Sequence, residues 1–450
     1  MGVVLTILGI VLAIFFFVIP QWKQKKRDDL TDKRHAEVKT DTAEIKDGIA
    51  ELINRVQELT NLAKQTPPED APKELINDLS LIIEVVDKLP PEDYYFLKAY
   101  ISQNKHEYEE AIGFYKKAIK LKPDYANAYN NMGTAYDNWN GQYEKAIECY
   151  QKAIELNQRD ADVYYNMGTT YAMWNGQYEK AIKCFQKAIN LKPEFPKAYY
   201  NMGLAYADGK QDYEEAIKCY EKAIKLKPDY ANAYNNMGTA YDNWNGQYEK
   251  AIECYGKAIK YKPDHANAYY NMGLVYQDWK QDYEKAVECY EKAIELNPKD
   301  ANAYYNMGNA YEDWDGQYKK AIECYQKAIE YKTDYADAYY NLGYAYAKRK
   351  QDYEKAIECF EKAIEYKSDY ASAYYNMGLA YANWNGQYEK AIECWEKAIE
   401  YKSGYASAYY NIGVTYEELG DRKQAITSMK KAAELGDEDA MQWLEEMGIE

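Results

Sequence analysis

The sequence predicts an all-α protein built from stacked helical hairpins. Nine glycines lie 35 residues apart, and a tyrosine stands three residues after each of them. Thirteen residues after the first glycine comes Ala146, and Ala153 follows seven residues later, as the small residues of a second helical pattern. A fixed period of this length indicates a solenoid of repeated supersecondary units. The glycines are Gly133, Gly168, Gly203, Gly238, Gly273, Gly308, Gly343, Gly378 and Gly413.

Composition limits what the chain can do. Its 450 residues are 47% apolar and 29% charged, so they can bury a large core and are not typical of a disordered chain. The net charge of −17 argues against a nucleic-acid partner, because binding phosphates needs a basic surface. The three histidines, His35, His106 and His265, are far apart, which argues against histidine metal sites and general bases. We expect no metal and no cofactor.

The N-terminus predicts a membrane anchor over residues 1–22. Val3–Ile19 carries no charge, and its 17 residues reach about the shortest length that crosses a bilayer. Trp22 and a basic run that starts at Lys23 follow it. We therefore expect a single-pass membrane protein that contacts lipid through residues 3–19, with the repeat array in the cytoplasm.

Two segments separate this anchor from the repeats. Residues 23–66 are expected to form a helical stalk with a heptad seam, which would join two copies of the chain as a weak homodimer through residues 42–63 or pack only on a neighbouring element. The seam residues are Ile45, Ile49, Leu52, Val56, Leu59 and Ala63. Residues 67–92 are expected to be a linker bounded by proline pairs, with one helix over 73–89.

One repeat unit shows how the hairpins form. The pattern predicts a first helix over about 126–138 and a second over about 143–156, joined by a turn at Asn140-Gly141. Gly133 is small enough to let the two helices approach closely, and the tyrosine rings would fill the remaining space. Asp124, after Pro123, is the expected N-cap of the first helix. One hairpin cannot cover its own apolar face, so neighbouring units must stack.

This pattern resembles the tetratricopeptide repeat (TPR) family. The family's succession of large, small and aromatic positions is present as Tyr129, Met132-Gly133, Tyr136, Ala146 and Tyr150. Most units have one residue more than the family's usual 34. The resemblance implies a right-handed solenoid of about ten hairpins over residues 93–436, whose first helices line a groove for peptides or partner domains. Residues 437–450 are expected to form a capping helix with Trp443 and Leu444 packing inward.

An asparagine two residues before each glycine is the main candidate for contact with a ligand. Its amide matches the donors and acceptors of a peptide backbone, but it would equally satisfy the backbone of a neighbouring repeat. These residues are Asn131, Asn166, Asn201, Asn236, Asn271, Asn306, Asn341, Asn376 and Asn411. The preceding position carries a tyrosine in most units, suited either to ligand contact or to packing between helices. The candidates there are Tyr165, Tyr200, Tyr270 and Tyr305.

Other predicted groove positions are mainly acidic. A basic or polar extended ligand would fit this charge, although a solvated acidic face without a ligand is the commoner explanation for such residues. They are Asp137, Asp162, Asp208, Asp242, Asp278, Glu312, Asp313 and Asp337. Lys197, Lys348 and Arg349 are exceptions. Six tryptophans in the turns are expected to pack over the next unit's turn rather than form an exposed ridge. Eight cysteines spaced by 35 are expected to be free and buried.

These patterns predict a protein-interaction scaffold or adaptor that binds protein or peptide partners. The alternative is a structural protein that self-associates without a separate client. An enzyme is not expected, because no nucleophile–base set, metal cluster or phosphate-binding glycine loop is present in the sequence.

Overall fold

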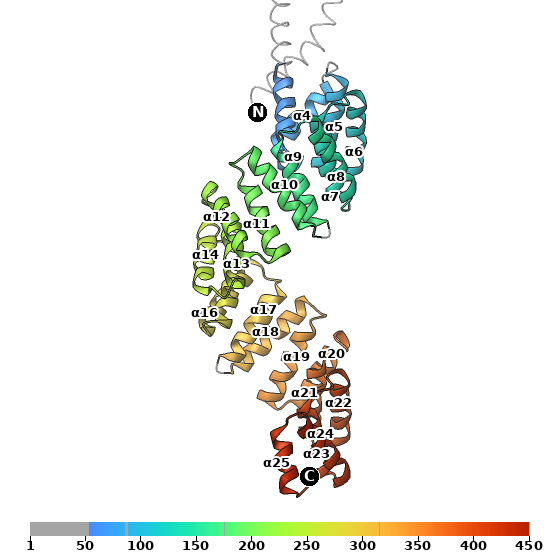
Figure 1. Cartoon of the computed structure of the whole chain (residues 1–450), viewed down its shortest axis with the longest axis vertical. Coiled ribbons are helices and arrows are strands. Elements are labelled where there is room, and N and C mark those ends of the chain that lie inside the picture. The colour runs from blue at the N-terminus through green and yellow to red at the C-terminus, as the bar shows by residue number, and fades with distance from the viewer. Residues whose placement is uncertain (1–53, 86–88, 175, 315, 450) are drawn as a thin grey trace, which may run out of the picture. The chain divides into compact units, whose positions relative to one another are not determined.

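The computed structural model describes residues 54–85, 89–174, 176–314 and 316–449, and every element in these ranges is helical. The chain divides into unit 1, which ends at Asp212, and unit 2, which begins at Tyr213. Figure 1 shows the paired helices along the chain. The predicted all-α, TPR-type solenoid is confirmed for these ranges.

Unit 1 begins with a helix over 54–65. It continues with η2 Pro68–Asp70, α4 Lys73–Val85, α5 Pro91–Asn104, α6 Tyr108–Leu121, α7 Ala126–Asn138, α8 Tyr143–Leu156, α9 Ala161–Met173, α10 Tyr178–Leu191 and α11 Pro196–Lys210. Helix 54–65 and α4 contribute to the same core as the first hairpins.

Unit 2 begins with α12 Tyr213–Leu226, α13 Ala231–Asn243, α14 Tyr248–Tyr261, α15 Ala266–Asp278, α16 Tyr283–Leu296, α17 Ala301–Asp313 and α18 Tyr318–Tyr331. It ends with α19 Ala336–Ala345, the π-helical η3 Tyr346–Lys350, α20 Tyr353–Tyr366, α21 Ala371–Asn383, α22 Tyr388–Tyr401, α23 Ala406–Glu418, α24 Arg422–Glu434 and α25 Glu438–Glu446. The predicted bounds of the example hairpin are confirmed by α7 and α8.

The turn within a hairpin requires left-handed backbone. Asn140 and Gly141 have φ of 56° and 61°, and the same pair recurs at Asn245 and Gly246. Asparagine and glycine tolerate this conformation better than other residues do. The sequence signal for the turn is therefore confirmed.

The predicted N-cap at Asp124 is wrong. Helix α7 begins at Ala126, as predicted, but its N-cap residue is Tyr125, which makes no side-chain cap bond. The Tyr125 ring stacks on Phe96 at 5.0 Å between centroids, and its hydroxyl donates to Asp93 at 2.6 Å. Packing against the preceding hairpin accounts for a tyrosine at this position, whereas Asp160 caps α9 in the ordinary way.

Glycine lets the two helices of a hairpin touch, as α17 and α18 do. A Cβ on Gly308 would lie 2.6 Å from the Cε1 atom of Tyr325, whose side chain is fully buried. The same approach brings Gly133 against Tyr150 and Gly378 against Trp395. The glycine ladder is thus a packing requirement of the hairpin.

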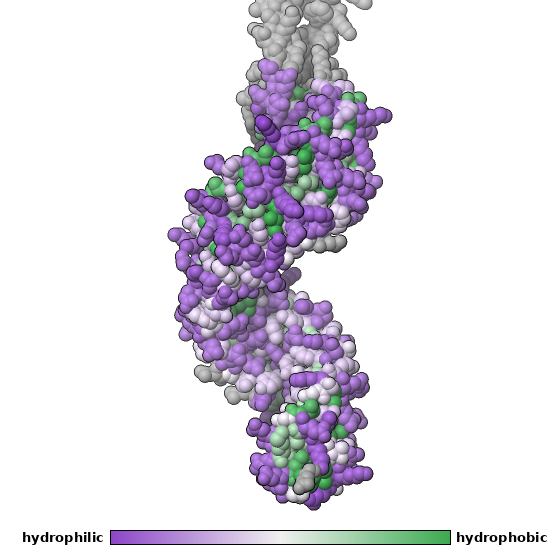
Figure 2. Space-filling model, viewed as in Figure 1, coloured by the Kyte–Doolittle hydropathy of each residue, from purple (hydrophilic) through white to green (hydrophobic). Residues whose placement is uncertain are grey.

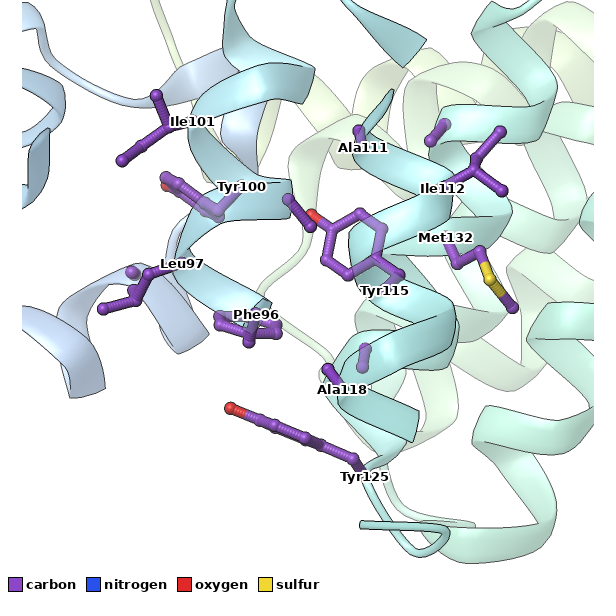
Figure 3. Packing of buried hydrophobic residues seen from close by; sticks show 14 of the residues in the cluster. Phe96, Leu97, Tyr100, Ile101, Ala111, Ile112, Tyr115, Ala118, Tyr125 and Met132 are labelled. Atoms are coloured by element: carbon purple, nitrogen blue, oxygen red, sulfur yellow. The ribbon is translucent and has the colours of Figure 1, made fainter. Parts of the chain in front are cut away.

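The core of unit 1 is aromatic and includes residues that precede the repeats. Figure 3 shows Phe96 and Tyr100 of α5 facing Tyr115 of α6, all fully buried. Val56, Leu59 and Ala63 of helix 54–65 belong to the same core, so the described part of the predicted heptad seam packs on its own chain. Residues 42–53 of the seam lie outside the described residues, and a homodimer through 42–63 stays a prediction.

Unit 2 ends in helix α25, which packs on α24. Leu444 of α25 is buried and Trp443 packs against the same small cluster, which also contains Met429 of α24. Figure 2 shows that hydrophilic side chains cover most of the visible surface, with apolar side chains showing through between them. This pattern is expected for amphipathic helices that bury one face.

The prediction of a single-pass membrane protein is corrected by the structure. Within the described ranges, no helix has both the length and the apolar character that a bilayer crossing needs. The longest of helices α4–α25 is α11, whose 15 residues extend for about 22 Å, short of a hydrocarbon core of about 30 Å. The segment Val3–Ile19, on which the predicted anchor depended, lies outside the described residues.

Candidate functional site on the first helices

The candidate groove residues lie on the first helix of each hairpin. We call the face that carries the nine asparagines the ladder face. It is formed in unit 1 by α7, α9 and α11, and in unit 2 by α13, α15, α17, α19, α21 and α23. The side chain of Asn131 is buried, whereas the other eight asparagines are half-buried. The structure therefore places all nine at one register of successive hairpins.

Seven of the nine asparagines donate to the preceding hairpin, whereas Asn131 and Asn236 accept from the preceding residue of their own helix. In unit 2 the Asn306 amide donates to the Tyr270 hydroxyl at 2.8 Å, and Asn376 donates to Tyr340 at 2.7 Å. Further bonds of this kind are Asn201 to Tyr165 at 3.0 Å, Asn341 to Tyr305 at 3.2 Å and Asn411 to Tyr375 at 3.0 Å. In each case the acceptor lies 36 positions earlier in the chain.

Two hairpins use an asparagine in place of the tyrosine acceptor. The Asn166 amide donates to Oδ1 of Asn130 at 3.1 Å, and Asn271 donates to Oδ1 of Asn235 at 3.2 Å. The expected contact with a neighbouring repeat is therefore present, but it is made to a side chain rather than to the backbone. Contact between these asparagines and a ligand stays a prediction.

The tyrosine rings of the ladder face also join hairpins. Tyr305 lies 6.0 Å from Tyr325 of its own hairpin and 4.9 Å from Tyr335 at the start of the next, measured between ring centroids. Burial raises the pKa of Tyr305, while its hydrogen bonds lower it. Tyr165 packs in the same way between Phe185 and Phe195. Tyr270 and Tyr200 occupy the corresponding position on α15 and α11.

An acidic strip crosses the ladder face of unit 2. It consists of Asp242 on α13, Asp278 on α15, and Glu312 and Asp313 on α17. Burial raises the pKa of each carboxyl group, and a neighbouring carboxylate raises it further for Asp242, Asp278 and Glu312. For Asp313, a hydrogen bond from Gln277 opposes the rise in pKa. Within the described ranges no salt bridge joins these four groups to a lysine or arginine. The strip is therefore a surface of uncompensated negative charge.

The remaining acidic positions have separate local roles. Asp137 accepts from the Thr170 hydroxyl at 2.9 Å, and its other oxygen is buried without a partner in the described structure. Asp162 lies 3.7 Å from the ammonium group of Lys192. Asp208 is exposed near the end of α11, and partial desolvation of its carboxyl group raises the pKa. These residues do not extend the acidic strip.

A cavity of about 280 Å³ opens where η3 meets α20 and α21. Phe360 and Leu379 line its apolar part, and Asn376 and Lys348 line its polar part. Lys348 also lies 5.7 Å from the centre of the Tyr344 ring. Lys348, one of the three basic exceptions in the predicted groove, thus borders a cavity that is large enough for one side chain.

The exposed fractions of the tryptophan and cysteine side chains test the predictions made for them. All six turn tryptophans are half-buried, and Trp279 stacks on Tyr248 of the preceding hairpin at 4.9 Å. The tryptophan is packed rather than exposed, but its contact is with the second helix of the preceding hairpin and not, as expected, with the next unit's turn. All eight cysteines are buried thiols that form no disulfide with one another, as predicted.

Sequence reasoning missed part of the ladder face in the first hairpin. Tyr100, Gln103 and Asn104 of α5 bind the chain segment just before α4 through side-chain hydrogen bonds. This hairpin lacks the glycine, and Ala99 stands 34 rather than 35 residues before Gly133. A search that allowed an alanine and a turn shorter by one residue would have found it.

Comparisons with known proteins agree with this architecture. The TPR repeat family model matches residues 98–138, 140–173, 175–209, 210–243, 245–278, 280–313, 315–350, 348–383 and 385–420, and a tetratricopeptide repeat model matches 406–435. Comparison with curated proteins gave no match.

Several solved structures are similar over part of the chain. A MamA structure has 30% identity, covering 37% of this chain and 96% of its own, with a TM-score of 0.35. YrrB, described as a TPR protein with an unusual peptide-binding site, has 28% identity and covers 42% and 95%, with a TM-score of 0.36. MamA from Desulfovibrio magneticus RS-1 has 30% identity and covers 39% and 96%, with a TM-score of 0.35.

The family models match well over half of the chain, and the hairpins have the small and aromatic contacts that the repeat pattern requires. The chain belongs to the tetratricopeptide repeat family.

Proposed function

We propose that this protein is an interaction scaffold that binds a basic, extended segment of a partner protein along the ladder face of unit 2. The acidic strip carries the proposal. Asp242, Asp278 and Asp313 follow one another on three successive first helices without a basic partner among the described residues. A ligand with spaced lysines or arginines would relieve their mutual repulsion.

The half-buried asparagines support an extended ligand beside the strip. Each asparagine amide has two hydrogens and a carbonyl oxygen, so donating one hydrogen to the preceding hairpin does not exhaust its capacity. Asn271 and Asn306 stand on the same helices as Asp278 and Asp313. We therefore propose that the carboxylates select positive side chains, while the asparagines contact the ligand backbone.

The test is binding of a labelled peptide of ten alternating lysine and serine residues to the full chain, followed by fluorescence anisotropy. A peptide with glutamate in place of lysine is the ligand control. We expect the lysine peptide to bind, with an affinity that falls as salt is added, and we expect no binding of the glutamate peptide.

A charge-matched pair of variants separates the strip from the overall negative charge. The first variant is Asp242→Asn/Asp278→Asn/Asp313→Asn. The second is Glu330→Gln/Glu365→Gln/Glu400→Gln, which removes three exposed carboxylates that pair with lysines on second helices. We expect at least a tenfold loss of affinity in the first variant and little change in the second. An equal loss in both would show attraction by net charge alone and would refute the proposed site.

A further inference from the structure

A segment of the chain itself lies across the first helices of unit 1. The Tyr100 hydroxyl donates to the Thr66 carbonyl at 2.9 Å, and the Asn104 amide donates to the Pro68 carbonyl at 2.7 Å. On α7, Asn127 donates to the Lys64 carbonyl at 2.7 Å. Side chains of two successive first helices thus bind the backbone of residues 64–68, as they would bind a separate peptide.

The acidic residues that follow are bound through their side chains. Gln103 donates to Glu69 at 2.6 Å, and Asn138 donates to the same carboxylate oxygen at 3.3 Å. The ammonium group of Lys197, on α11, lies 3.5 Å from Asp70. Lys197 is one of the basic exceptions in the predicted groove, and it faces an acidic group of this segment.

One of the binding groups, Gln103, is also held by the first hairpin itself. Gln103 is fully buried, and its carbonyl oxygen accepts from the Tyr115 hydroxyl at 2.9 Å, which directs the amide nitrogen towards Glu69. Glu69 and Asp70 are themselves exposed, so the two carboxylates lie on the surface of this site and are not part of the core. A donor held in this way, facing an exposed acidic segment, is a feature of a peptide site.

We infer that the first helices α5, α7 and α11 form a binding site for an acidic segment of the type Pro-Glu-Asp, and that residues 64–70 occupy this site in cis. A partner with such a segment must displace the chain's own residues before it binds. This site is in unit 1 and prefers the opposite charge to the proposed site in unit 2, so either proposal can fail without the other.

The segment is held close to its site by both of its neighbours. Helix 54–65 contributes Val56 and Leu59 to the core of unit 1, and α4 contributes Leu75 and Leu79. A ligand tethered over such a short distance has an effective concentration of order millimolar. A free peptide of the same sequence is therefore expected to bind the natural chain very weakly.

The experiment uses a labelled peptide of residues 62–73 as the probe and the full chain as the receptor. In the main variant, residues 66–71 are replaced by three Gly-Ser pairs, which keep the tether but remove the bound side chains. We expect the variant to bind the peptide at least tenfold more tightly than the natural chain does. A peptide with Glu69→Gln and Asp70→Asn is expected to bind the variant at least tenfold more weakly than the unmodified peptide.

A second receptor covers the case in which the replacement disturbs folding. Glu69→Ala/Asp70→Ala changes two exposed side chains and is also expected to raise affinity for the peptide tenfold. Adding Asn138→Ala and Lys197→Ala should abolish that gain, whereas adding Asn243→Ala, at the equivalent position of unit 2, should not. If a variant of natural helicity binds the peptide no better than the natural chain, the inference is wrong.

Discussion

The side-chain amide of Asn306 donates to the hydroxyl of Tyr270, 2.8 Å away in the preceding hairpin. Both side chains are half-buried, and the bond joins α17 to α15. Its counterparts make the ladder face a series of links between hairpins as well as a candidate surface for ligands. Stability and recognition therefore depend on the same residues.

Replacing Asn306 with alanine is expected to lower the free energy of unfolding by about 1 kcal/mol, the usual net value of one intramolecular hydrogen bond. Urea unfolding followed by circular dichroism measures the change. Tyr270→Phe removes the same bond from the other side, so the double variant should lose less than the sum of the two single losses. Strictly additive losses would contradict the proposed link.

Gly308→Ala is expected to cost about 1–3 kcal/mol, because the new methyl group would overlap the buried ring of Tyr325. Gly256→Ala provides the matched control on α14. Gly256 is exposed within its helix, and a Cβ there meets no atom within 4 Å. Since alanine is the better helix former, the control should gain about 0.5–1 kcal/mol. Thermal melting of the two variants should therefore shift in opposite directions.

Asp278→Asn is expected to stabilise the protein at neutral pH. Burial and the neighbouring Asp313 raise the pKa of Asp278, so the folded chain holds this proton more tightly than the unfolded chain. Stability contributed by the protonated carboxyl group is lost as the pH rises through the folded pKa. The increase in urea midpoint should be largest near pH 7 and should shrink towards about pH 4, near the pKa of an unfolded aspartate. A gain that does not vary with pH would exclude charge as its cause.

The cysteines are expected to react slowly with a thiol reagent at pH 8. Burial raises the pKa of Cys149 and Cys324 to about 12 each, which leaves about one thiolate in ten thousand molecules at that pH. All eight thiols should react rapidly once urea unfolds the chain. Absorbance at 412 nm with Ellman's reagent follows both reactions. Rapid labelling of the folded chain would contradict the buried positions.

Much of the fold could be predicted because each hairpin repeats one local pattern. The spacing of Gly133, Tyr136 and Ala146 fixes the helix faces, and Asn140-Gly141 marks the turn. The error at Asp124 arose because the packing of Tyr125 on the preceding hairpin, which the local sequence does not encode, sets the start of α7.

The candidate site was predicted less completely, because it too depends on packing between hairpins. The sequence placed Asn306 on the correct helix face but did not identify Tyr270 as its partner, since that depends on how adjacent hairpins are rotated. The segment at Glu69 was missed because its contacts join residues 34 and 69 positions apart with no repeated pattern.

The interval of 36 between donor and acceptor allows the array to change in length. Each of these hydrogen bonds joins the ladder-face asparagine of one hairpin to the residue just before the corresponding asparagine of the preceding hairpin. If residues 266–300 were deleted, Asn306 would stand 36 positions after Asn235, the acceptor that Asn271 uses now. The hydrogen bond between the two hairpins would form again, with an asparagine as donor and Asn235 as acceptor. Duplication or loss of whole 35-residue blocks can therefore lengthen or shorten the molecule without the need for new contacts at the junction.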